Sequence, residues 1–257
     1  MLAAFFTAGY GKGLQAPVKE APPQAQQQVK IAKIRFATGP MGEGEEYMPG
    51  VGPSGSWPGI VVVPDSWGLT DVIRSQARSL ASHGYLVVAV DLYDGRTPSS
   101  SREAEEWMNL LPQQDAVSKL QGAVSFLQGW MANPERVGVV AWGSGGALAL
   151  RLAASENNLK AVVVNYGPLS QDYSLLERIT SPILVNAGAL DTNTSSEQIA
   201  SFTRAVKLPA SRKDIKIYSA AGHNFEDAQN NRAYRPTDAI DADKRTVAFL
   251  AKWLKGS

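Results

Sequence analysis

The chain has 257 residues, 44% of them hydrophobic, and its 25 basic and 24 acidic side chains leave a net charge of +1. Because no basic cluster or stripe stands out, we expect no nucleic-acid partner and no membrane partner. The chain has no cysteine and two histidines, which excludes disulfides, a cysteine nucleophile and a Cys-ligated or His-rich metal site. We expect neither a metal nor a cofactor.

Residues 1–28 differ in composition from the rest of the chain. The apolar stretch from Leu2 to Thr7 lacks a basic flank and is shorter than the core of a signal peptide, and Gln15 to Gln28 is rich in Pro, Ala and Gln. We therefore expect a flexible tail over 1–28 and one domain over 29–257. We expect a cytoplasmic protein, and the alternative is a secreted or periplasmic protein with a truncated signal.

From Val29 onward, strand-like and helix-like patterns alternate. Val29 to Phe36 alternates apolar with charged residues and predicts an edge strand, whereas the Gly- and Pro-rich residues 39–58 predict turns with at most a short strand. Beyond them the sequence predicts strands at 60–64, 85–90, 137–141, 159–165, 182–187 and 214–218, and helices at 71–83, 101–110, 113–131, 195–206 and the C-terminus. This alternation predicts an α/β fold with a mainly parallel sheet of seven or eight strands, helices on both faces, and ligands bound beyond the carboxyl ends of the strands.

The most informative stretch runs from Arg136 to Ala154 and reads RVGVVAWGSGGALALRLAA. A buried strand meets a glycine-dense turn, and the chain passes at once into a helical Ala and Leu pattern. Turns of this kind present a nucleophile above the end of a parallel strand, and neighbouring glycines let the strand and the helix approach.

This stretch resembles the dienelactone hydrolase family of the α/β-hydrolase fold, where it reads roughly R-V-G-V-V-G-[YW]-C-x-G-G and the Cys, or a Ser, is the nucleophile. Counting from Arg136 or back from Gly146 gives the same register, and that register puts Gly143 at the nucleophile position. Gly143 has no side chain, and the hydroxyl of Ser144 comes one residue too late.

Two further motifs follow predicted strands in the order expected for this fold. The resemblance to G-x-x-D makes Asp191 the orienting acid, and the resemblance to A-G-H-x-F makes His223 the general base. The alternative is that Asp191 caps the following helix and that His223 is an ordinary loop residue.

The segment from Pro64 to Thr70 resembles the family's H-E-x-[FW]-G-L-N. Asp65 stands where the family has a Glu that interacts with the nucleophile. The resemblance implies that the backbone N–H groups of Ser66 and Ser144 form the oxyanion hole, and these donors do not depend on a side chain at the apex.

Other residues are candidates for substrate binding. The D-L-Y segment at residues 91–93 resembles the family's, and it implies that Arg96 holds a substrate carboxylate, with a solvated surface Arg as the alternative. A second Arg of some family members is replaced by Asp227. Four aromatic residues follow predicted strands or flank the motifs and predict a mostly apolar cleft for a small ester, lactone or aromatic ligand: Trp67, Trp142, Tyr166 and Phe225.

Three interpretations of function remain open. In the first, Ser144 has become the nucleophile of an active serine esterase with Asp191 and His223; in its alternative, Ser144 caps the helix that follows. In the second, a protein without a nucleophile binds a small ester or lactone, or acts on it without a covalent step. In the third, Gly143 is an engineered knock-out of an ordinary hydrolase. We expect a monomer or a homodimer.

Overall fold

A computed structural model describes residues 29–37, 41–50, 56–129 and 132–256 of the chain. The tail expected at 1–28 lies outside these residues. No helix in the described ranges is long and apolar enough to cross a membrane.

The described residues form one eight-stranded sheet in the order β1-β2-β4-β3-β5-β6-β7-β8. The first two strands are antiparallel to their neighbours, and all other neighbouring pairs are parallel. The mainly parallel α/β sheet predicted from the sequence is therefore confirmed. The strands are β1 (Lys30–Phe36), β2 (Gly42–Met48), β3 (Trp57–Val63), β4 (Leu86–Asp91), β5 (Ala132–Trp142), β6 (Ala161–Asn165), β7 (Ile183–Gly188) and β8 (Lys213–Tyr218).

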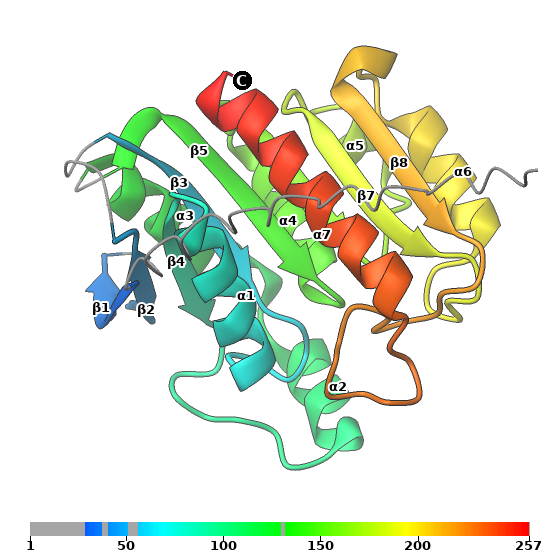
Figure 1. Ribbon diagram of the computed structural model, residues 1–257, viewed down its shortest axis with the longest axis horizontal. Coiled ribbons are helices and arrows are strands. Elements are labelled where there is room, and N and C mark those ends of the chain that lie inside the picture. Colours follow the sequence, from blue (N-terminus) through cyan, green and yellow to red (C-terminus); the bar gives the residue numbers. More distant parts are fainter. Residues whose placement is uncertain (1–28, 38–40, 51–55, 130–131, 257) are drawn as a thin grey trace, which may run out of the picture.

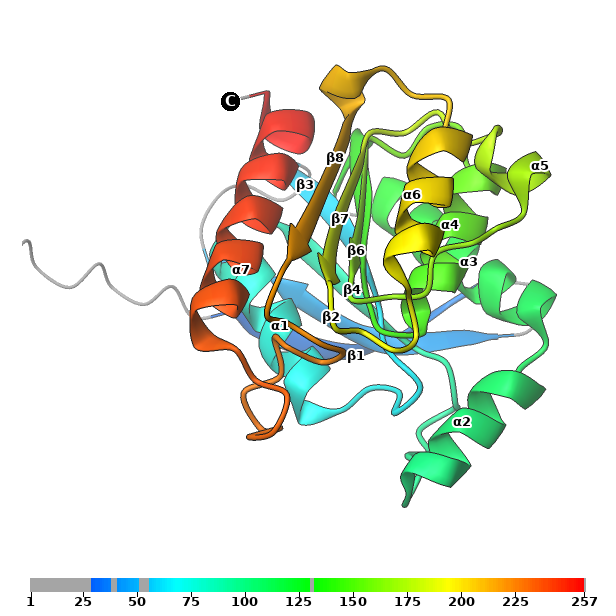
Figure 2. The same cartoon turned by 90° about the vertical axis from the view of Figure 1, so that its right-hand side faces the viewer.

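Helices cover both faces of the sheet (Figures 1 and 2). On one face lie α1 (Asp71–Ser82), α7 (Pro236–Leu250) and the π-helical turn η2 (Ala251–Lys255); on the other lie α3 (Gln113–Gly129), α4 (Gly145–Ser155) and α6 (Ser196–Ala205). Each face buries its own cluster of apolar side chains against the sheet. The short helix α5 (Tyr173–Leu176) and the 3₁₀ turn η1 (Ala210–Arg212) lie in connections, and the sequence pattern did not predict them.

The central strands are buried because helices leave neither face open to solvent. In β5 the residues from Val137 to Trp142 are all buried, and Val139 pairs with Val61 on one side and Val162 on the other. An uninterrupted apolar run is what a parallel strand covered on both faces requires.

The prediction of turns over residues 39–58 is wrong for β2. Its seven residues, GEGEEYM, pair along their whole length with β1, and most of them pair with β4. Gly44 lies so close to β4 that an added Cβ would be 2.5 Å from the Ala89 carbonyl oxygen. The glycines that suggested turns instead allow close backbone approach in a strand, and only the neighbouring strands show this.

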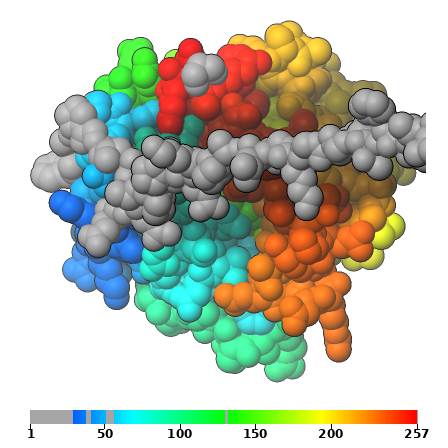
Figure 3. All heavy atoms as spheres, viewed as in Figure 1, coloured from blue at the N-terminus to red at the C-terminus, as the bar shows by residue number. Residues whose placement is uncertain are grey.

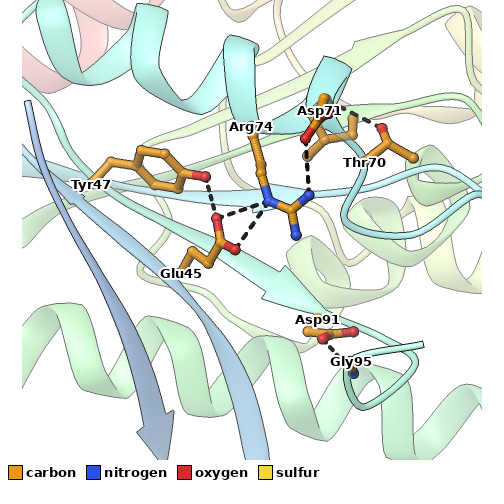
Figure 4. A network of polar contacts seen from close by, with 8 residues as sticks. Glu45, Tyr47, Thr70, Asp71, Arg74, Asp91 and Gly95 are labelled. Carbon is orange, nitrogen blue, oxygen red and sulfur yellow. Dashed lines mark hydrogen bonds and ion pairs between the residues drawn. The ribbon is translucent and has the colours of Figure 1, made fainter. Parts of the chain in front are cut away.

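Polar side chains join this edge of the sheet to α1 (Figure 4). Arg74 on α1 donates to both carboxylate oxygens of Glu45 on β2, at 3.1 and 3.2 Å, and also to Asp71. The hydroxyl of Tyr47 donates to Glu45 as well. These contacts hold α1, and with it the loop that precedes α1, against the sheet.

Helix α2 (Ser101–Leu110) lies apart from the layers and projects beyond the carboxyl ends of the parallel strands (Figure 2). Ala104 is its only buried residue, and the helix makes few close backbone contacts with other helices or strands. At the same end, the orange segment that follows β8 lies beside the cyan segment that includes α1 (Figure 3).

Candidate active site

In the turn between β5 and α4, the glycine backbone packs closely against the ends of the neighbouring strands. Gly143 has φ +49°, and its N–H donates to the carbonyl of Asn165 at the end of β6 at 3.0 Å. A Cβ added at Gly145 would lie 2.3 Å from the Pro64 carbonyl oxygen, and one added at Gly146 would lie 2.7 Å from Val164. The glycines therefore let α4 approach the ends of β3 and β6, as the sequence predicted.

The space above Gly143 adjoins the ring of His223. A Cβ at residue 143 would lie 3.8 Å from His223 Nε2, 3.8 Å from a ring carbon of Tyr166 and 2.9 Å from Asp65 Cβ. The last distance is shorter than real Cβ contacts, and the atom that blocks the space belongs to the base of a side chain. A side chain at residue 143 would therefore begin beside the histidine ring, in a space that fits a glycine.

His223 and Asp191 form a hydrogen-bonded pair. Nδ1 of His223 is 3.0 Å from Oδ2 of Asp191, and the other carboxylate oxygen accepts from the Asn193 N–H at 2.8 Å. The Asp191 side chain is 1% exposed and that of His223 is 28% exposed. The following helix α6 is capped by Ser195, so the Asp191 carboxylate contacts the imidazole and does not cap that helix.

The loops after β7 and β8, which carry this pair, are joined by backbone hydrogen bonds. Leu190 N–H donates to the Ala221 carbonyl at 2.9 Å, and Ala189 N–H donates to the Tyr218 carbonyl at 2.9 Å. Beside the pair, two non-glycine residues have positive φ, Tyr166 at +39° and Asn224 at +60°. Such conformations cost about 1–3 kcal/mol each and concentrate at functional sites.

Ser144 lies at the N-cap position of α4, but its hydroxyl makes no cap hydrogen bond. Its Oγ is buried and has no hydrogen-bond partner among the described residues, His223 included. The expected helix-capping bond is therefore absent, and so is a contact that would activate Ser144 as a nucleophile.

The loop after β3 supplies a carboxylate and a backbone donor. Asp65 Oδ1 accepts from the Trp67 N–H at 2.9 Å, and burial raises the pKa of the Asp65 carboxyl. The Ser66 carbonyl accepts from the Tyr93 hydroxyl at 3.1 Å. Among the described residues, the N–H groups of Ser66 and Ser144 have no acceptor, which leaves both available to an oxyanion.

These residues open onto a cleft of about 420 Å³. Its walls are mainly polar, and of the four aromatic side chains expected there only Trp67 lines it. Tyr166 stands behind His223, edge-on at 5.4 Å between ring centroids, whereas Trp142 and Phe225 are buried in the core. Their positions after strands predicted a cleft, but Phe225 packs against the rings of Tyr166 and Tyr218, and the Trp142 indole donates to Glu226. The lining residues are Asp65, Ser66, Trp67, Ser101, Glu105, Met108, Asn109, Ser144, Pro168, Asn193, His223 and Asn224.

Arg96 does not line this cleft. Its guanidinium lies 5.0 Å from the ring of Trp107, and it borders a larger cavity of about 820 Å³ on the other side of α2. The D-L-Y motif determines where this loop begins. The direction of the Arg96 side chain depends on its contact with Trp107 on α2, a helix that lies outside the motif.

One residue of the site region escaped the sequence analysis. Glu226 accepts from the indole N–H of Trp142 at 3.2 Å, and its other oxygen is buried without a partner among the described residues. Burial raises the pKa of this carboxyl to about 8. The one sequence feature that could have indicated Glu226 is its position directly after the A-G-H-x-F motif. Within the described ranges, no group of three or more His, Asp or Glu side chains could hold a metal ion.

Comparison with known proteins gives a consistent assignment. A family model described as "Dienelactone hydrolase family" matches residues 49–254. A Bradyrhizobium protein named "Probable 2-oxo-3-(5-oxofuran-2-ylidene)propanoate lactonase" is 27% identical over 214 residues, which cover 78% of this chain and 85% of that protein.

Solved structures share the fold at low sequence identity. A dienelactone hydrolase-like promiscuous phosphotriesterase from metagenomic libraries has a TM-score of 0.77 at 23% identity, over 88% of this chain and 98% of that one. A dienelactone hydrolase from Anabaena variabilis has a TM-score of 0.66 at 21% identity, over 88% of this chain and 99% of that one.

Proposed function

Since this chain belongs to the dienelactone hydrolase family, we propose that its cleft binds a small ester or lactone and hydrolyses it slowly without a covalent intermediate. The observation that carries this proposal is the space above Gly143. A nucleophile there would lie beside His223 Nε2, but the residue has no side chain and Asp65 crowds the place of one. The base, its orienting acid and the backbone donors are all retained around that space.

In this mechanism a water molecule takes the place of the nucleophile. His223 Nε2 removes a proton from the water as its oxygen bonds to the carbonyl carbon, while Asp191 stabilises the imidazolium through Nδ1. The N–H groups of Ser66 and Ser144 hold the oxyanion. Collapse of the tetrahedral intermediate breaks the ester C–O bond, and the imidazolium returns the proton to the leaving alkoxide. Loss of a triad member costs on the order of 10⁴ to 10⁶ in rate, so turnover is low.

The alternative functions meet specific obstacles. A serine esterase requires Ser144 Oγ to contact His223, but that atom is buried and unpartnered within the described part of the chain. An ordinary hydrolase with a deleted nucleophile would keep room for a Cβ at residue 143, yet Asp65 Cβ would lie 2.9 Å from it. Both observations support a site built around glycine.

The test compares p-nitrophenyl acetate hydrolysis by the wild type, His223→Ala and Ser144→Ala, with intact-mass spectrometry to detect an acylated protein. We expect slow wild-type turnover, its loss in His223→Ala, its retention in Ser144→Ala, and no acyl adduct. His83→Ala is the matched control, because His83 ends α1 outside the cleft. An acyl adduct on Ser144, or turnover abolished by Ser144→Ala, would establish the serine esterase instead.

A further inference from the structure

Helix α2 forms one wall of the His223 cleft and also separates it from the larger cavity. Glu105 and Met108 line the cleft that contains His223, whereas Trp107 and Leu110 line the cavity on the other side. Trp107 packs edge-on against Tyr93, with 5.3 Å between ring centroids. This contact fixes which face of α2 borders the cleft, and therefore which of its charges a ligand meets.

The charges that line the cleft are of one sign, apart from His223 when it is protonated. Asp65 lies beside the space above Gly143 and Glu105 lies on the wall that α2 forms, and the lining contains no Lys or Arg. Asp227 adds a further negative charge near Asp65 and contributes to the raised pKa of that carboxyl.

Two cations near α2, Arg96 in the loop before it and Lys119 on α3, border the larger cavity instead. The Arg96 guanidinium stacks on Trp107, and the Lys119 ammonium pairs with Asp94 at 2.6 Å; both residues line the larger cavity. The lining of the His223 cleft therefore presents carboxylates to a ligand and no Lys or Arg side chain. An anionic ligand is repelled there, and a cationic one is attracted.

The lining also contains an indole, a side chain that can attract a cation. Trp67 is the one aromatic residue in the lining, and its backbone is bonded to the Asp65 carboxylate at 2.9 Å. An alkylammonium group gains from an indole face in addition to a carboxylate, whereas a neutral group of the same shape gains only packing.

We propose that this cleft prefers esters that carry an alkylammonium group over neutral esters of the same shape, that it binds esters that carry a carboxylate least tightly, and that Glu105 determines this preference. The inference rests on the proposed function, because it treats the His223 cleft as the ester site. Glu105 is exposed at the rim, so its contribution is about two- to fivefold in affinity, as for an exposed ion pair.

The test uses two probes of one shape, acetylcholine and its neutral analogue 3,3-dimethylbutyl acetate, together with the anion 4-acetoxybutanoate. Dissociation constants are measured by ligand-observed NMR titration of the full chain at low ionic strength. We expect acetylcholine to bind about two- to fivefold more tightly than the neutral ester, and the anion to bind least. The preference should shrink at 0.5 M salt, because screening weakens exposed charges.

Neighbouring glutamates provide the matched variants. Glu105→Lys should abolish or reverse the preference and Glu105→Gln should reduce it. Glu106→Lys should leave the preference unchanged, because Glu106 lies on the same helix and is exposed outside the cleft lining. All three substitutions lie at exposed positions and are compatible with folding.

The outcomes separate this inference from the function on which it rests. If both isosteric esters bind equally, or if Glu106→Lys changes the preference as much as Glu105→Lys does, the charge preference is wrong while the ester site stands. If no ester binds and none is hydrolysed, the proposed function and this inference fall together.

Discussion

At residue 143, the backbone conformation and a neighbouring residue both disfavour a side chain. A backbone φ of +49° disfavours any side chain, and an added Cβ would be crowded by Asp65 Cβ at 2.9 Å. At the same time, His223 Nε2 is 3.8 Å from that position, close enough for a longer side chain to reach it with its terminal atom. A side chain at residue 143 would therefore lie beside the histidine, but the backbone conformation and Asp65 both disfavour a side chain there.

Replacement of Gly143 should expose both features. We expect Gly143→Cys, and less effectively Gly143→Ser, to gain a burst of p-nitrophenolate from p-nitrophenyl acetate and an acyl adduct, because the base and the backbone donors are in place. Both variants should lose about 1–3 kcal/mol of stability from backbone strain. Gly143→Ala is the control, since it carries the strain without a nucleophile. A Cys variant that loses stability but shows neither burst nor adduct would contradict the assignment of the apex.

The buried carboxyl of Glu226 should make the free energy of unfolding depend on pH. Burial raises its folded pKa from 4.5 to about 8, so the folded state holds a proton that the unfolded state releases. The stabilisation is complete below pH 4.5 and is lost as the pH rises towards 8. Nearby Asp243 contributes to the raised pKa as well.

Glu226→Gln removes the titration and keeps an oxygen that can accept from Trp142. We expect the variant to be more stable than the wild type at pH 8, by up to about 4 kcal/mol, and to differ little from it at pH 4.5. Urea denaturation at a series of pH values measures the difference. The same substitution at the exposed Glu106 is the control, and a difference between wild type and Glu226→Gln that does not change with pH would refute the buried titration.

At the scale of elements, the packing of α4 against β3 holds the apex in place. A Cβ on Gly145 would lie 2.3 Å from the Pro64 carbonyl oxygen, a backbone atom that cannot rotate away. Because Pro64 directly precedes Asp65, a shift there also moves the cleft wall. Close packing of a helix against the end of a strand therefore links stability to the geometry of the site.

We expect Gly145→Ala to lose about 1–3 kcal/mol of stability, as overpacked positions do, and to bind esters more weakly because the Asp65 loop is displaced. Gly129→Ala is the matched control, because an added Cβ there meets nothing within 4 Å and its φ is not in the left-handed region. Urea denaturation and the ester titration give the two readouts. Equal stability of the two variants would show that α4 can retreat from β3 without cost.

At the scale of the whole molecule, the eight strands bring four distant segments to one end of the sheet. Residues near 65, 143, 191 and 223 meet because parallel strands place their carboxyl ends at a common edge. The sequence patterns that predict these segments are local: a buried apolar run, a glycine-dense turn, and an acid and a histidine that each follow a strand. These patterns need only the neighbouring residues to be recognised.

The sequence by itself determined the α/β class, the mainly parallel sheet and the family, because each strand pattern, helix pattern and motif can be recognised from residues close together in the chain. The tertiary structure decided the features that depend on contacts between residues far apart in the chain. It made a strand of Gly42–Met48, because glycine suits a close strand neighbour as well as a turn. It buried Trp142 and Phe225, turned Arg96 to the far side of α2 and placed Glu105 on the cleft wall. A side chain's direction depends on the helices that cover it, and a strand-end position does not contain that information.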